Sequence, residues 1–295
     1  MKYFERVTVA LCLDRIDADL LGHARLVRDM AEGEVRFSFV HVLAAQEGWS
    51  RRTPLHPPMD EVRAAVGAAV EEHFGPVDPS TLHVLTGSHL DKLLETAAEE
   101  GSDLLMVGHR RAARGSRSSS RRLAMKAPCS VWMVPEGAPP RISNVVAASD
   151  FSQPSGHAVS LATLIASRAG QKTCTVLHVR PPGLLGLDRQ DVERDFDSFL
   201  APLDLHGLAV RPVVEESGSV AGTLMRLFAA EGADLAVVGT RGHSPAAAVL
   251  LGSESEHVLR ESHIPVLVTK DRGDRLGMLS ALLDRDFRSI EPQFS

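Results

Sequence analysis

The sequence has few cysteines, few aromatic residues and no long apolar run. Its 295 residues include 3 cysteines, and aromatic residues make up 4%. The cysteines (Cys12, Cys129 and Cys174) lie in apolar segments and form no C-x-x-C pair, which predicts reduced, buried thiols in a cytoplasmic protein. The scarcity of aromatic side chains disfavours a surface that stacks nucleic-acid bases.

An excess of positive charge is also missing. The formal net charge is -6 at pH 7, so we expect neither nucleic acid nor an anionic membrane as a partner. The longest apolar runs have about the length of a strand, which predicts no membrane-spanning segment. Residues 1–6 lack the apolar core of a signal peptide and lead directly into a predicted strand.

The same order of patterns occurs in both halves of the chain, which indicates an internal duplication. Each pattern combines an apolar strand with a characteristic polar or glycine residue at its end. The matched segments are Val7–Asp14 with Val145–Asp150, Phe37–Val42 with Cys174–Val179, Val84–Ser88 with Val214–Ser219, Asp103–Gly108 with Asp234–Gly239, and Ala127–Val131 with Ile264–Val268. In this alignment Asp14 is the counterpart of Asp150.

Helical periodicity between these strands predicts alternating strands and helices, and therefore parallel sheets covered by helices on both faces. The sequence thus predicts two tandem α/β domains, each with a doubly wound, five-stranded parallel sheet. We expect the fifth strands, Val131–Val134 and Val266–Val268, to meet in an intramolecular pseudo-dimer. The predicted divisions are residues 1–137, residues 138–272 and a tail, 273–295, with an amphipathic helix.

One glycine pattern in the second half is typical of a phosphate-binding loop. Gly239 and Gly242 are followed, after nine residues, by Gly252 and Ser253. A predicted strand precedes this G-x-x-G-x9-G-S pattern, and a predicted helix, Glu254–Glu261, follows it. Glycines let backbone N–H groups approach an anion, and the start of a helix carries unpaired donors and partial positive charge. Ser253 is placed to cap that helix or to contact a phosphate.

With this pattern, each half resembles a universal stress protein domain, and the chain resembles a tandem member of that family. The resemblance covers roughly residues 4–135 and 141–270. It implies binding of an adenine nucleotide, usually ATP, with a divalent cation such as Mg²⁺ or Mn²⁺, and a Rossmann-like fold similar to other adenine-nucleotide-binding α/β domains. Enzymatic turnover is not generally implied. The residues that would hold the nucleotide are Ala148, Ser149, Asp150, Val179, Val238, Gly239, Thr240, Arg241, Gly242, Gly252, Ser253, Glu254 and Ser255.

The side chains in this set suggest different roles. Asp150 follows a strand and can accept hydrogen bonds from ribose hydroxyls. Arg241 can donate to phosphate, although a solvated loop arginine is an equal alternative. Glu254 favours the start of a helix but repels a polyphosphate unless a cation lies between them. It therefore predicts cation dependence, weaker ATP binding or a less charged nucleotide.

The first half departs from the glycine pattern. Gly108 and the pair Gly115-Ser116 remain, but Arg111 replaces the second glycine and three residues, not nine, precede Gly115. We therefore expect nucleotide binding in the second half only. The arginines and serines of segment 109–122 form either a solvated loop or a substitute site for an anion or a partner; a solvated loop is the more common outcome of such a charge run.

The histidines suggest structural roles. His243, His257 and His263 are close in sequence, but nothing in their spacing secures a metal site. His41 and His178 end equivalent strands, and we interpret both as packed or hydrogen-bonded.

Three functions follow from these patterns. The first is a nucleotide-dependent stress-response regulator, and the second is a nucleotide-free, dimerising interaction module. The third is an adenylating or slowly ATP-hydrolysing enzyme, which is disfavoured because we find no nucleophile with a base and an orienting group.

Overall fold

The computed structural model describes residues 4–44, 58–110, 119–180, 182, 189–240 and 253–270. For residues 119–121, 189, 190 and 253 only the backbone is described. The predicted tail helix and most of the glycine loop lie outside these ranges.

Strands and helices alternate through both halves. The first half contains β1 (Arg6–Leu11), α1 (Ile16–Asp29), β2 (Arg36–Ala44), α2 (Met59–His73), the short 3-10 helix η1 (Pro79–Thr81), β3 (Leu82–Gly87), α3 (His89–Glu99), β4 (Leu104–His109), α4 (Ser119–Lys126) and β5 (Ser130–Pro135). The second half contains β6 (Val145–Ala148), α5 (Gln153–Arg168), β7 (Thr173–Arg180), α6 (Arg189–Leu200), β8 (Ala209–Glu216), α7 (Val220–Ala230), β9 (Leu235–Gly239), α8 (Ser253–Glu261) and β10 (Val266–Thr269).

The strands of each half are parallel to one another, in the order β3-β2-β1-β4-β5 and its repeat β8-β7-β6-β9-β10. The chain therefore moves first to one side of β1 or β6 and then to the other. That reversal is the arrangement expected of a doubly wound α/β sheet. In open sheets of this kind such a reversal is the usual place of a crevice, which here falls at the carboxyl ends of β1 and β4 and at those of β6 and β9.

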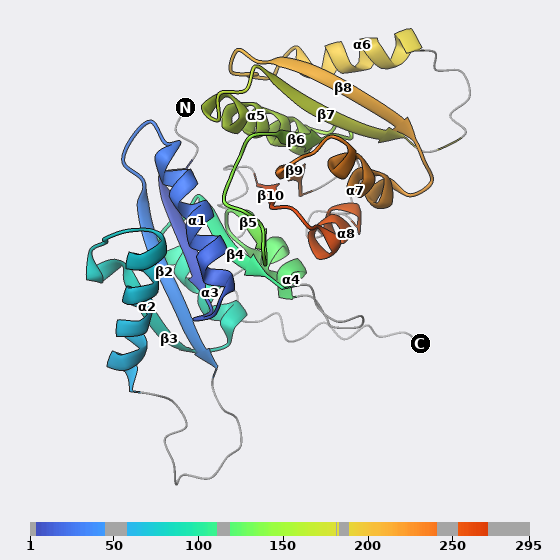
Figure 1. Cartoon of the computed structure of the whole chain (residues 1–295). Coiled ribbons are helices and arrows are strands. Elements are labelled where there is room, and N and C mark those ends of the chain that lie inside the picture. Colours follow the sequence, from blue (N-terminus) through green and yellow to red (C-terminus); the bar gives the residue numbers. More distant parts are fainter. Residues whose placement is uncertain are drawn as a thin grey trace, which may run out of the picture.

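The two halves share one sheet instead of forming two separate ones. β5 and β10 pair antiparallel, with Trp132 opposite Leu267, and this joins all strands into a ten-stranded sheet (Figure 1). The fifth strands do meet, but as hydrogen-bonded neighbours. Both are fully buried, because helices from each half cover them.

The helices form two layers that run across both halves. One buried apolar cluster contains side chains from α1, α2, α5 and α6 on one face of the sheet. A second cluster contains side chains from α3, α4, α7 and α8 on the other face. Strands covered on both sides are nearly continuous apolar runs, as the sequence of β4 (LLMVGH) illustrates. The halves are thus joined through the core as well as through the sheet.

The segment between the halves is packed rather than extended into solvent. Gly137 N donates to Asp19 Oδ2 of α1 at 2.7 Å. A Cβ atom at Gly22 would lie 2.8 Å from Pro140, so the glycine lets this proline lie directly against α1. The segment between β5 and β6 is therefore fixed on the first half.

Candidate functional site

The second crevice collects most of the described candidate residues. Ala148 ends β6, with Ser149 and Asp150 directly after it, while Val238 and Gly239 end the neighbouring strand β9. Val179 lies near the end of β7, on the other side of β6. In open α/β sheets, ligands bind at this kind of topological switch point.

The turn after β6 is held by a serine network. Ser149 Oγ lies 2.9 Å from Ser155 Oγ and accepts a hydrogen bond from Phe151 N at 3.0 Å. Phe151 has a φ of 63°, a conformation that is strained for a bulky residue. Asp150 Oδ1 accepts from both the amide and the hydroxyl of Ser152, the N-cap of α5. The carboxylate is therefore fixed at the first turn of α5, whose dipole favours negative charge.

Gly239 allows α5 to approach the end of β9. A Cβ atom there would lie 3.0 Å from the carbonyl carbon of Pro154 and 3.1 Å from Ser155 N. These are backbone atoms of the first turn of α5, so they move only if the helix moves. The first glycine of the pattern thus brings this helix N-terminus against the switch point.

The start of α8 is tied to the same crevice. Ser255 Oγ donates to the carbonyl oxygen of Gly239 at 3.0 Å. Thr240, the last described residue before the loop, is buried. The helix α8 begins at Ser253, one residue before the predicted Glu254. Ser253 is therefore its first helical residue and not its N-cap. The described residues on the two sides of segment 241–252 therefore lie next to each other.

Glu254 has a different partner from the one that the sequence suggests. Its Oε2 accepts a hydrogen bond from Ala221 N, in the first turn of α7, at 2.6 Å. The N-cap residue of α7, Ser219, makes no capping bond with its own side chain. Glu254 therefore caps α7, and its carboxylate is held at the N-terminus of that helix.

His178 supports the turn from β7. Its Nδ1 donates to the carbonyl oxygen of Ser149 at 2.9 Å, and its ring stacks on Phe151 with centroids 4.2 Å apart. Burial lowers the pKa of this imidazole. His41 makes the same bond to Leu11 O at 3.0 Å. The interpretation of both histidines as hydrogen-bonded structural residues is confirmed.

These shared contacts correct the alignment of the halves. Leu11 and Ser149 receive the equivalent histidine bonds, and two residues later Leu13 and Phe151 share a positive φ. Cys12 is therefore the counterpart of Asp150, and Asp14 is the counterpart of Ser152. The sequence alignment of Asp14 with Asp150 is wrong by two residues.

In the first crevice the charged side chains pair with one another. Arg110, which follows β4, contacts the carboxylate of Asp14 and lies 3.8 Å from Glu136. Arg15 also pairs with Glu136. The pKa of Asp14 is lowered, first by its bond from the Ile16 amide and then by Arg110. Arg110 thus lies across the edge that corresponds to the glycine loop of the second half.

Comparison with known proteins agrees with this duplicated architecture. The sequence profile of the universal stress protein family matches residues 6–135 and again residues 141–270. The chain belongs to the universal stress protein family. A universal stress protein from Archaeoglobus fulgidus DSM 4304 aligns over 90% of this chain and 96% of its own, at 17% identity and a TM-score of 0.66. A putative universal stress protein from Pseudomonas aeruginosa UCBPP-PA14 aligns over 95% and 98%, at 17% identity and a TM-score of 0.67.

These structural likenesses establish the fold of this universal stress protein. No curated protein matches the chain. In the described part of the chain, no helix is long and apolar enough to cross a membrane, and no histidine, cysteine and carboxylate cluster could hold a metal ion.

The structure of this universal stress protein brings Ala148, Ser149, Asp150, Val179 and the Val238–Thr240 segment to three neighbouring strand ends. Ser255 is tied to the same place. Arg241, Gly242 and Gly252 lie outside the described residues, as does His243.

Sequence reasoning missed Arg180, at the end of β7. Its Nη2 lies 3.3 Å from Glu216, while its Nη1 is buried without a hydrogen-bond partner among the described residues. The only sequence signal was its position after Val179. Sequence reasoning also placed Cys12 in a buried strand, but β1 ends at Leu11 and Cys12 is exposed; Cys129 and Cys174 are buried as expected.

Proposed function

We propose that this universal stress protein binds an adenine nucleotide, most simply ATP, at the carboxyl edge of β6 and β9. The observation that carries the proposal is the meeting of Asp150, Gly239 and the start of α8 at one switch point. The glycine spacing from Gly239 to Ser253 supplies the phosphate-binding part.

The residues present suit a nucleotide. Asp150 is held where a carboxylate can accept from ribose hydroxyls, and the backbone of Val179 lies beside it for the base. Gly239 lets the N-terminus of α5 lie directly against the end of β9, and Arg180 Nη1 offers a buried donor. The predicted Arg241, Gly242, Gly252 and Ser253 would complete the phosphate contacts, and a divalent cation such as Mg²⁺ or Mn²⁺ would offset the negative charge of the phosphates.

We further propose that the first half binds no nucleotide. It carries Cys12 in place of Asp150, and Arg110 is held across the crevice by Asp14 and Glu136. In this proposal the divisions are residues 1–137, 138–272 and the tail, 273–295. The halves act as an intramolecular pseudo-dimer joined at β5 and β10.

The activity is then regulatory rather than enzymatic: a cytoplasmic protein that reports nucleotide level under stress. A low cysteine content without a C-x-x-C pair fits the reducing cytoplasm. A nucleotide-free interaction module that forms homodimers is the alternative.

The decisive experiment is to denature the purified protein, identify any released nucleotide by mass, and titrate the nucleotide-free protein with ATP, ADP and AMP by calorimetry. The proposal expects adenine nucleotide and a single site per chain. Two equivalent sites per chain would contradict the asymmetry, and no binding of any of the three would favour the interaction module.

A further inference from the structure

The register of the strands identifies which residues of β5 and β10 are equivalent. Leu105 of β4 pairs with Val131 of β5. Its counterpart in β9, Ala236, pairs with Val266 of β10. Val131 is therefore the counterpart of Val266, and the sequence match of Val131 with Val268 is wrong by two residues.

One step further along, Trp132 is the counterpart of Leu267. These two residues also lie directly opposite each other in the joint between β5 and β10. The pseudo-two-fold axis that relates the halves therefore passes through this pair. If two like halves paired in the same way, the axis would bring together two tryptophans or two leucines.

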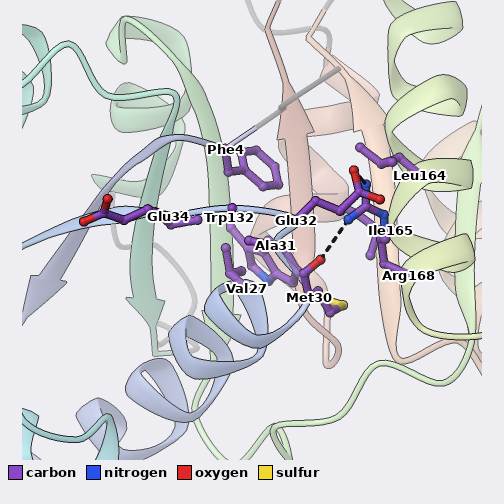
Figure 2. Close-up of a pocket in the computed structure, with 12 residues that line it drawn as sticks. Phe4, Val27, Met30, Ala31, Glu32, Glu34, Trp132, Leu164, Ile165 and Arg168 are labelled. Carbon is purple, nitrogen blue, oxygen red and sulfur yellow. Dashed lines mark hydrogen bonds and ion pairs between the residues drawn. The ribbon is translucent and has the colours of Figure 1, made fainter.

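The unlike pair fills a closed place in the core. Trp132 and Leu267 are both fully buried and belong to the same apolar cluster. Trp132 lines a small cavity together with Val27 of α1 and Ile165 of α5, so its indole reaches the helices of both halves (Figure 2). Side chains directly opposite each other in an antiparallel pair are close neighbours. Two indoles would therefore overfill this place, whereas two leucines would leave the volume of a ring empty.

A charge pair between the helices makes the same distinction. Arg168, at the end of α5, has its Nη2 atom 2.7 Å from Glu32, and its Nη1 donates to the Met30 carbonyl at 3.2 Å (Figure 2). Counted from the shared positive-φ residue of each half, Met30 is the counterpart of Arg168. The stretch after Arg168, residues 169–172, contains no acid. A pair of first halves would therefore lack the arginine, and a pair of second halves would lack the glutamate.

We propose that this joint is specific for unlike halves. The surface of the first half formed by β5 and the end of α1 accepts a half with leucine at the axis and arginine at the end of the facing helix, and it rejects a second copy of itself. Such specificity is a difference between two pairing energies, and here the like pairs are penalised by packing and by a lost ion pair. The buried centre discriminates more than the charge pair, because Glu32 is exposed. The proposal is independent of nucleotide binding.

The intact chain can carry all four centres, so their melting temperatures test the proposal directly. Leu267→Trp places two tryptophans at the axis and should lower the melting temperature by roughly 3–10 °C. Trp132→Leu places two leucines there and should lower it by a similar amount, because it leaves a cavity. The reversed centre, with both substitutions in one chain, is again an unlike pair. It should recover at least about half of the loss caused by Leu267→Trp.

Phe228→Leu is the matched control for the reversed centre. It removes a fully buried aromatic ring from α7, in the other apolar cluster. Combined with Leu267→Trp it should add its own loss and recover nothing. Leu267→Phe serves if Leu267→Trp does not fold. The proposal is overturned if either like centre is as stable as the native one, or if Trp132→Leu recovers no more than Phe228→Leu does.

Glu32→Arg tests the charge pair. It sets a second cation against Arg168 and should lower the melting temperature by roughly 1–3 °C, with a larger effect at low salt than at high salt. Glu32→Arg combined with Arg168→Glu should recover part of that loss. An unchanged melting temperature of Glu32→Arg at low salt would contradict this part of the proposal.

Discussion

The two crevices of this protein share one backbone plan and differ in the charged side chains at their strand ends. In the first half, ion pairs cross the strand ends: Arg110 pairs with Asp14 and Glu136, and Arg15 pairs with Glu136. In the second half, the same edge holds Asp150 against a helix N-terminus and leads into a glycine pattern. The difference shows that a duplicated fold can retain its sheet while the charged side chains at one of two equivalent strand edges pair with one another. Four matched pairs of substitutions test this comparison.

Gly252→Val should have the largest effect. A side chain at this position of the glycine pattern would occupy the space of a phosphate, so we expect nucleotide affinity to fall at least about a hundredfold, close to complete loss. The matched variant, Gly115→Val, should not change it. Calorimetric titration measures both affinities. Equal affinities for Gly252→Val and the wild type would show that the glycine loop does not belong to the nucleotide site.

Gly239→Ala should disturb both stability and binding. Its Cβ atom would press on the backbone of Pro154 and displace α5, at a cost of about 1–3 kcal/mol in the free energy of unfolding. Gly108→Ala presses on the side chain of Ile16 and also destabilises. Only Gly239→Ala should weaken nucleotide binding, because the helix that it displaces, α5, borders the proposed nucleotide site. Denaturant unfolding and titration of both variants separate the effects; a similar loss of affinity in both would mean that general destabilisation explains it.

Asp150→Asn should reduce nucleotide affinity about tenfold, since a charge-assisted hydrogen bond becomes a neutral one while the acceptor for Ser152 remains. Asp14→Asn is the control in the first half: it weakens the pairing with Arg110 and should leave affinity for the nucleotide unaltered. A loss of binding in Asp14→Asn would show that the first crevice takes part.

Glu254→Val should have the smallest effect. The sequence alone predicts tighter ATP binding in the presence of a chelator, by removal of a repulsive carboxylate. The bond to Ala221 N predicts instead a loss of about 1 kcal/mol in stability, with affinity in chelator unchanged. Ser88→Ala, which removes the side-chain cap of the equivalent helix α3, should cost a similar amount. Tighter binding of ATP by Glu254→Val in chelator would restore the sequence-based explanation.

The sequence predicted the parts of the fold that depend on local apolar pattern. The predicted strands Val131–Val134 and Val266–Val268 lie within β5 and β10, and the predicted helix Glu254–Glu261 is α8 without its first residue. The order of strands followed from the duplication. The joining of the two sheets into one did not follow from the duplication, because pairing between β5 and β10 depends on contacts between segments far apart in the chain.

The candidate site was less predictable where a single contact decides the geometry. Matching Asp14 to Asp150 paired identical residues, whereas the positive φ of Leu13 and Phe151 determines the true register. The partner of Glu254 is a backbone amide 33 residues away, which no spacing rule identifies. Arg180 belongs to no sequence motif, so no pattern selected it.

The joint between β5 and β10 has a consequence for how this protein responds to its own concentration. Two separate chains that paired through these strands would dissociate on dilution. Here both strands belong to one polypeptide, and the segment that connects the two halves is fixed on α1, so the effective concentration of one strand for the other does not depend on how much protein the cell makes. Expression level can therefore set the number of these molecules without changing the fraction that is assembled.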